Sequence, residues 1–121
     1  MAIKKILIVD DSKTELMYLT DLLVKSGFSV KTAENAEDAF RRLAEEKPEL
    51  ILMDVVMPGK NGFQLTRTIT RDPLYAGSPI IMCTSKNQDT DRVWGMRQGA
   101  RDYIVKPVKA DELMAKIKAL D

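Results

Sequence analysis

The chain has 121 residues, 45% of them hydrophobic, and its 19 Lys and Arg side chains nearly balance 18 Asp and Glu. This length and apolar content predict one domain with a buried core, and a net charge of +1 lacks the basic excess typical of nucleic-acid binding. The absence of His excludes His metal ligands, Ser-His and Cys-His nucleophile pairs and a role of this chain as a phosphohistidine carrier. A single Cys excludes an internal disulfide.

Short apolar runs and helical patterns alternate along the chain. A continuous apolar run is typical of a parallel strand covered on both faces, and apolar residues three and four apart predict an amphipathic helix. Asp11 or Ser12 marks the first helix start and Asn35 the second, while Gly27 and Pro48 mark the ends of these helices. In chain order we expect strands at residues 6–9, 28–32, 50–53, 79–83 and 102–105.

The second half of the chain continues this alternation. The turn at residues 57–62 precedes a helix that extends to about Arg71, and another helix covers residues 89–98. The last helix is expected to bury Leu113, Met114, Ile117 and Leu120. Five strands that alternate with five helices predict an α/β fold with a doubly wound parallel sheet of order 2-1-3-4-5. We expect residues 1–121 to form one domain, without room for an effector domain.

No apolar stretch approaches the ~20 residues that span a bilayer, and the opening MAIKK leads directly into a strand without a signal peptide. We therefore expect a cytoplasmic protein with no membrane insertion. Cys83 lies inside an apolar run, which predicts a buried, reduced thiol.

Four of the predicted strands end on polar or ionisable side chains. Asp10 and Asp11 follow the first strand, Asp54 the third, Thr84 the fourth and Lys106 the fifth. The carboxyl ends of parallel strands lie on one edge of the sheet, so these side chains should meet in one crevice. Two carboxylates ~4 Å apart repel by roughly 4 kcal/mol at an effective dielectric of about 20. Because oxygen ligands with room for water suit Mg²⁺, the sequence predicts a phosphoryl-transfer site around this ion.

Asp54 is the candidate nucleophile at this site because it ends the predicted central strand. A carboxylate nucleophile produces an acyl phosphate. Mg²⁺ would neutralise charge on the phosphoryl group, Lys106 would add a second positive contact, and the Thr84 hydroxyl would donate a hydrogen bond.

Each of these residues also has a structural interpretation. Asp10 and Asp11 can cap a helix, and Asp54 can be a turn residue. Thr84 can open a loop, and Lys106 can be an ordinary strand exit. Their joint occurrence at four strand ends favours the functional interpretation.

Two other classes of phosphate-handling protein fit the sequence less well. A phosphatase of the haloacid-dehalogenase type also uses an Asp at a strand end, but it needs a second Asp two residues later, where this chain has Val56. A nucleotide-binding protein needs a glycine-rich phosphate loop after the first strand, and DDSKTE at residues 10–15 contains no glycine.

Three motifs of this chain, together with Thr84, closely resemble the receiver domain of bacterial two-component response regulators. The motifs are LIVDDS at residues 7–12, LILMDVVMPGKNG at 50–62 and QGARDYIVKP at 98–107. This family includes the chemotaxis regulator, and the resemblance covers the whole chain. It implies a flavodoxin-like fold and a phosphoacceptor signalling protein, not an enzyme, that assists its own phosphotransfer and dephosphorylation. Asp54 would accept the phosphoryl group from a histidine kinase.

The same resemblance implies the ligands of Mg²⁺: Asp11, Asp54 and the backbone carbonyl of Val56 would bind the ion, and Asp10 would act mainly through a metal-bound water. Lys106 would pair with the phosphoryl group or with Asp54, and its peptide bond to Pro107 would be cis.

Thr84 and Tyr103 match the switch pair of the family, in which the hydroxyl moves toward the phosphoryl oxygen and the aromatic ring turns inward behind it. The output would be a changed surface on the fourth helix, fifth strand and fifth helix, with Tyr103 lying on it. Considered alone, Tyr103 also fits a half-buried aromatic residue of the sheet.

Two positions near the acceptor bear on the lifetime of the phosphoryl group. Val56 is apolar and Lys86 is long and cationic, and the family varies at both positions, which influence how water reaches the acyl phosphate. We expect slower self-hydrolysis than in a regulator with an acidic or amide residue at position 56.

Three segments resemble the single-domain receivers of type IV pilus chemosensory systems, which control twitching motility. These segments are DSKTE at residues 11–15, NGFQLTR at 61–67 and TDRVWGMRQGARDYIVKPV at 90–108. Trp94, with Arg92, Arg97, Arg101 and Tyr103, is the candidate partner surface. Packing of Trp94 against neighbouring loops is the alternative.

The expected partner is a histidine kinase of the chemotaxis type, and the downstream protein target is unknown. The chain is expected to be a monomer or a weak phosphorylation-dependent dimer. It would carry a signal or drain phosphoryl groups from a sister regulator. The remaining alternative is a receiver-shaped binding module that is never phosphorylated, and the intact acidic cluster argues against it.

Overall fold

The computed structural model describes residues 3–121. All neighbouring strands are parallel, and the strand order is β2-β1-β3-β4-β5, as the sequence predicted. The strands are β1 (Lys5–Val9), β2 (Ser29–Ala33), β3 (Leu50–Met53), β4 (Ile80–Thr84) and β5 (Asp102–Val105). The helices are α1 (Lys13–Lys25), α2 (Ala36–Glu45), α3 (Gly62–Arg71), α4 (Asp89–Arg97) and α5 (Ala110–Leu120).

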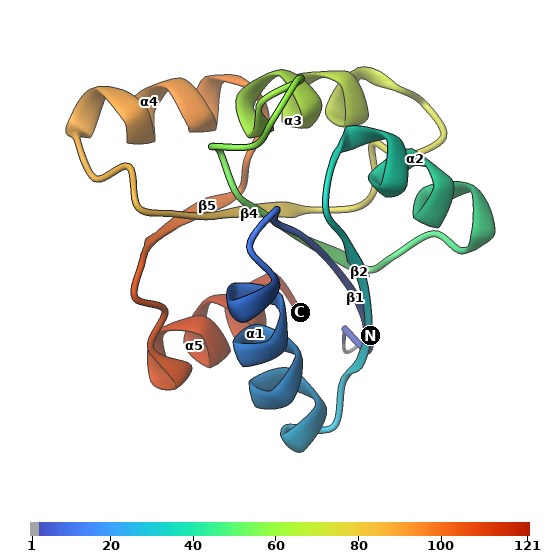
Figure 1. Ribbon diagram of the computed structural model, residues 1–121, viewed down its shortest axis with the longest axis vertical. Coiled ribbons are helices and arrows are strands. Elements are labelled where there is room, and N and C mark those ends of the chain that lie inside the picture. Colours follow the sequence, from blue (N-terminus) through green and yellow to red (C-terminus); the bar gives the residue numbers. More distant parts are fainter. Residues whose placement is uncertain (1–2) are drawn as a thin grey trace.

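The five-stranded sheet is covered on both faces (Figure 1), with α1 and α5 on one side and α2, α3 and α4 on the other. Successive side chains of a strand alternate between the two layers. In β1, Ile6 and Ile8 pack with α1 and α5, whereas Leu7 and Val9 pack with α2 and α3. Burial on both faces explains why the strands are continuous apolar runs in the sequence.

Most differences from the sequence predictions are small. β2 and β4 each lie one residue further along the chain than predicted, so Thr84 is the last residue of β4 instead of following it. Met114 and Leu120 are only partly buried. Cys83 is buried and its thiol is free, as expected, and burial raises its pKa well above the usual range. Within residues 3–121, no helix is long and apolar enough to cross a membrane.

Polar side chains cap three of the helices. Ser12, Asn35 and Asn61 each accept a hydrogen bond from the backbone N–H three residues later, at 3.3, 2.8 and 3.0 Å. Such caps satisfy N–H groups that have no partner within the helix. They fix where each helix begins, and thereby the length of the loop that precedes it.

The β3–α3 loop folds tightly back on the end of β3. The Gly62 N–H donates to the Val55 carbonyl at 2.8 Å, and a Cβ atom on Gly62 would overlap the carbonyl oxygen of Asp54. Only glycine therefore allows α3 to begin this close to the strand end.

We expect Gly62→Ala to destabilise the protein by about 1–3 kcal/mol, because the added methyl group meets backbone atoms that cannot turn aside. Urea unfolding measures the change in free energy. Gly77→Ala is the matched control, since a Cβ there approaches only the end of the flexible Lys47 side chain. Equal destabilisation of the two variants would contradict this account of the loop.

Candidate functional site

The carboxyl edge of the sheet brings together the side chains that the sequence placed at the strand ends. The Asp54 N–H donates to the Val9 carbonyl at 2.9 Å, which aligns the end of β3 with the end of β1. The Lys106 N–H donates to the Thr84 carbonyl at 2.9 Å, which aligns the ends of β5 and β4. Backbone pairing thus sets the positions of the candidate acceptor, hydroxyl and ammonium.

Three carboxylates form the acidic cluster of this edge. Asp10, Asp11 and Asp54 each offer an oxygen, and these atoms lie within 4.8 Å of one another. Asp10 and Asp54 are only 2% and 6% exposed, whereas Asp11 is exposed. Two buried like charges at this separation are poorly screened by solvent.

Lys106 supplies the positive charge next to this cluster. Its ammonium lies 2.7 Å from Asp10 Oδ2 and 3.7 Å from Asp54 Oδ2. The ion pair with Asp54 is the one that the resemblance implied, and the hydrogen bond to Asp10 is an additional contact. The Lys106-Pro107 peptide bond is cis, the isomer that the resemblance implied.

Backbone groups hold the two buried carboxylates. Asp10 Oδ1 accepts from the Ser12 N–H at 2.9 Å, and Asp54 Oδ1 accepts from the Val55 N–H at 2.8 Å. The Oδ2 atom of each carboxylate therefore faces the ammonium of Lys106.

Burial, followed by the charge of Asp10, raises the pKa of Asp54, and Lys106, the Thr84 hydroxyl and the Val55 N–H offset only part of this rise. For Lys106, burial lowers the pKa, but the hydrogen bond to Asp10 and the charges of Asp54 and Asp10 outweigh it, so the net pKa is raised. The ammonium therefore stays charged, and one positive charge faces three carboxylates.

The acidic cluster fits Mg²⁺. Its donors are all oxygen atoms, and the exposure of Asp11 leaves an open side for water ligands. The cluster carries two more negative charges than Lys106 neutralises, which a divalent cation would compensate. The backbone carbonyl of Val56, implied as a further ligand, belongs to the loop that directly follows Asp54.

A sequence profile of the response regulator receiver domain matches residues 6–118. The chain belongs to this family. The receiver is 52% identical over 116 residues to protein PilH of Pseudomonas aeruginosa, and the match covers 96% of each chain. It is 39% identical to the phosphate regulon regulator PhoB of the same organism, of whose length it spans 51%.

Solved structures agree with this family. The chemotaxis protein CheY4 of Vibrio cholerae superposes with a TM-score of 0.91 at 27% identity, and the match covers 99% of the receiver and 100% of CheY4. Receiver domains bind Mg²⁺ at an acidic pocket and work with histidine kinases. The acidic cluster of the receiver has the donor set for such a pocket.

Tyr103 lies inward, and the expectation that it lies on the partner surface is wrong. It is 1% exposed, and its hydroxyl donates to the Lys86 carbonyl at 2.8 Å. The Arg92 guanidinium covers the ring at 5.1 Å from the ring centroid. Burial raises the pKa of Tyr103 to about 12. Thr84 is fully buried and accepts from the Lys86 N–H at 3.3 Å, so both members of the expected switch pair contact the backbone of Lys86.

Helix α4 presents an apolar and basic outer face. Trp94 is 48% exposed, so part of its ring is open to a partner, and Val93 and Met96 beside it are also exposed. Arg92, Arg97 and Arg101 are exposed as well, so these side chains are accessible to a partner. We call Arg92, Val93, Trp94, Met96, Arg97 and Arg101 the α4 surface.

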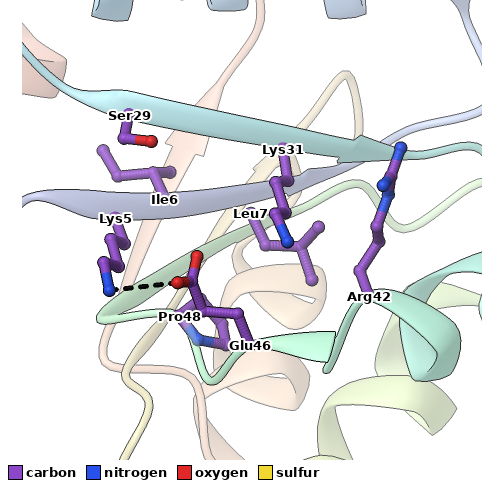
Figure 2. A pocket seen from close by; sticks show the side chains of 8 residues that line it. All are labelled: Lys5, Ile6, Leu7, Ser29, Lys31, Arg42, Glu46 and Pro48. Atoms are coloured by element: carbon purple, nitrogen blue, oxygen red, sulfur yellow. Dashed lines mark hydrogen bonds and ion pairs between the residues drawn. The ribbon is translucent and has the colours of Figure 1, made fainter. Parts of the chain in front are cut away.

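A hollow lies at the opposite edge of the sheet, where β1 and β2 begin (Figure 2). Lys5 and Glu46, which form an ion pair of 3.1 Å, line it together with Pro48. The hollow holds about 10 Å³, room for about one water molecule. It is a packing gap, away from the acidic cluster.

Sequence reasoning gave no role to Glu15, in the first turn of α1. Its Oε1 atom is buried, and no hydrogen-bond partner for it lies among residues 3–121. Ser12 and Glu15 have the spacing of a capping box, and this pattern gives Glu15 a structural role at the start of α1.

We expect Asp54→Asn to raise the unfolding free energy without Mg²⁺ at neutral pH by on the order of 1 kcal/mol, because it removes a buried carboxylate beside Asp10. Since the folded-state pKa of Asp54 lies above the usual 3.8, its ionisation opposes folding. The wild-type protein should therefore lose stability relative to Asp54→Asn as the pH rises above 3.8 toward and through the folded-state pKa.

Urea unfolding in EDTA at several pH values measures this difference. Saturating Mg²⁺ should reduce or reverse it, because the ion compensates the charge that the variant removes. If the difference in unfolding free energy between the wild type and Asp54→Asn is the same at all pH values, the ionisation of Asp54 does not contribute to that difference.

Proposed function

We propose that the chain is a response regulator in which Asp54 accepts a phosphoryl group from a histidine kinase in a Mg²⁺-dependent reaction. The observation that carries this proposal is the cluster of three carboxylates with a single ammonium at the sheet edge. In a scaffold without phosphoryl chemistry, buried carboxylates that repel one another would only lower the stability of the fold.

Asp54 Oδ2 is the attacking atom in this proposal, because Oδ1 is held by the Val55 N–H. Its bond to phosphorus forms as the bond from phosphorus to the kinase imidazole nitrogen breaks, and the imidazole leaves with that electron pair. Bound Mg²⁺ would neutralise part of the phosphoryl charge. Lys106 would direct its ammonium to a phosphoryl oxygen, and the Thr84 hydroxyl would donate to another.

The likeness to PilH supports a role in type IV pilus or chemotaxis-like signalling, with a kinase of the chemotaxis type. We propose the face formed by α4, β5 and α5 as the output, with Trp94 and the arginines of the α4 surface in contact with the target. Exposed aromatic and arginine side chains are typical of binding hot spots. The half-exposed ring of Trp94 supports this assignment.

We further propose that residues 1–121 act as one receiver domain in the cytoplasm, as a monomer or a weak phosphorylation-dependent dimer. The two core clusters extend from Ile3 to Ile117 without a break into separate units, which supports the single domain.

Incubation with acetyl phosphate should add one phosphoryl group to the wild-type protein in Mg²⁺, and none to Asp54→Asn or to the wild type in EDTA. Intact-protein mass spectrometry measures the addition. Asp38→Asn, which alters a partly exposed carboxylate in the first turn of α2 that does not belong to the cluster, is the control that should still be phosphorylated. No addition to the wild type, with acetyl phosphate or with candidate kinases, would favour a binding module that is never phosphorylated.

Val56→Asn should shorten the lifetime of the acyl phosphate several-fold. The Val56 side chain is 55% exposed and lines an open groove with Phe63 and Lys86 beside the acceptor. An amide there can hydrogen-bond a water near phosphorus, which an isopropyl group cannot do. The lifetime is measured by the loss of phosphoprotein mass after the donor is removed. Val56→Leu keeps an apolar side chain and should leave the lifetime close to that of the wild type; comparable lifetimes in all three proteins would contradict the proposed role of position 56.

A further inference from the structure

Glu15 is a partly buried residue for which the proposed phosphotransfer has no role. Its Oε1 atom is inaccessible to solvent and has no hydrogen-bond partner among residues 3–121. In a capping box this side chain would accept from the Ser12 N–H, but Asp10 Oδ1 takes that N–H at 2.9 Å. Oε1 is therefore free to accept a hydrogen bond from another group, and a buried oxygen without a partner is costly.

The first turns of α1 face the loop between β5 and α5. Tyr18, one turn after Glu15 on the same side of the helix, donates its hydroxyl to the Val108 carbonyl at 2.7 Å. Leu16 and Val108 belong to the same core cluster. Glu15 thus lies on the side of α1 that approaches the loop carrying Lys106. Consistent with this position, the charge of Glu15 contributes to the raised pKa of Lys106.

We propose that Glu15 is a positioning residue that takes over the Lys106 ammonium when Mg²⁺ occupies the acidic cluster. This inference rests on the proposed Mg²⁺ site. In the structure, Asp10 holds the ammonium at 2.7 Å. A divalent cation among Asp10, Asp11 and Asp54 draws on the charge of these carboxylates and repels the ammonium. Glu15 lies outside that cluster and keeps an uncommitted oxygen.

This exchange of partners would keep Lys106 in the crevice before phosphoryl transfer. Without it, the long Lys106 side chain would be driven toward solvent by the metal ion and would have to be recovered for each reaction. With it, the ammonium stays within reach of Asp54 Oδ2, from which it is 3.7 Å away in the structure. Its hydrogen bond to Glu15 is then exchanged for one to a phosphoryl oxygen.

The test follows the ammonium protons of Lys106 by NMR of ¹⁵N-labelled protein, with the signal assigned by its loss in Lys106→Arg. Wild type, the isosteric Glu15→Gln and the control Glu112→Gln on the first turn of α5 are compared with and without Mg²⁺. Backbone amide shifts of Asp11 and Val56 report metal binding independently.

Without Mg²⁺, we expect slow proton exchange in all three proteins, because Asp10 holds the ammonium. With Mg²⁺, exchange should stay slow in the wild type and the control but become at least about tenfold faster in Glu15→Gln, the effect of losing one charge-assisted hydrogen bond.

Equal exchange in Glu15→Gln and the wild type, at Mg²⁺ concentrations that saturate the amide shifts, would overturn the partner exchange and leave the metal site intact. Amide shifts that do not respond to Mg²⁺ would instead overturn the metal site, and the partner exchange with it.

Discussion

Repulsion among three carboxylates at one sheet edge is the constraint on which the functional part of this molecule depends. The backbone pairing of the neighbouring strands β1 and β3 forces Asp10 and Asp54 together in a buried place, and one ammonium offsets only part of their charge. The apolar layers on both faces of the sheet supply the stability that tolerates this conflict. The result is a sheet edge with excess negative charge that attracts a cation, which is what a metal-assisted phosphoryl acceptor requires.

A short chain of contacts connects this edge to the outer face of α4. The Lys86 N–H donates to Thr84 Oγ1, and the Lys86 carbonyl accepts from the Tyr103 hydroxyl. The ring of Tyr103 in turn lies beneath the guanidinium of Arg92. One peptide segment is therefore shared by the acceptor side and the helix side. A displacement of the Thr84 hydroxyl toward a phosphoryl group would act directly on the segment that holds Tyr103 inward.

The fold and the strand-end residues could be predicted because they depend on patterns within short segments. Strands buried on both faces are continuous apolar runs, and a parallel sheet places their ends on one edge. The hydrogen bond from Lys106 to Asp10, the burial of Tyr103 and the exposure of Trp94 depend instead on side-chain conformations and on contacts between distant elements. The contact of Arg92 with the Tyr103 ring is one example. Glu15 was missed for a related reason: its local capping pattern was intact, and only the competing bond from Ser12 to Asp10 frees its carboxylate.

The exposure of Trp94 has a practical consequence. The chain has one tryptophan, and that residue lies half exposed on α4 while the buried Tyr103 is on the adjacent strand β5. Its indole emission therefore comes from a single known position, on the face proposed to meet the target. Binding of a partner there would remove water from the ring and shift the emission to shorter wavelength, which makes the native protein its own optical probe of complex formation, without a dye or an added label.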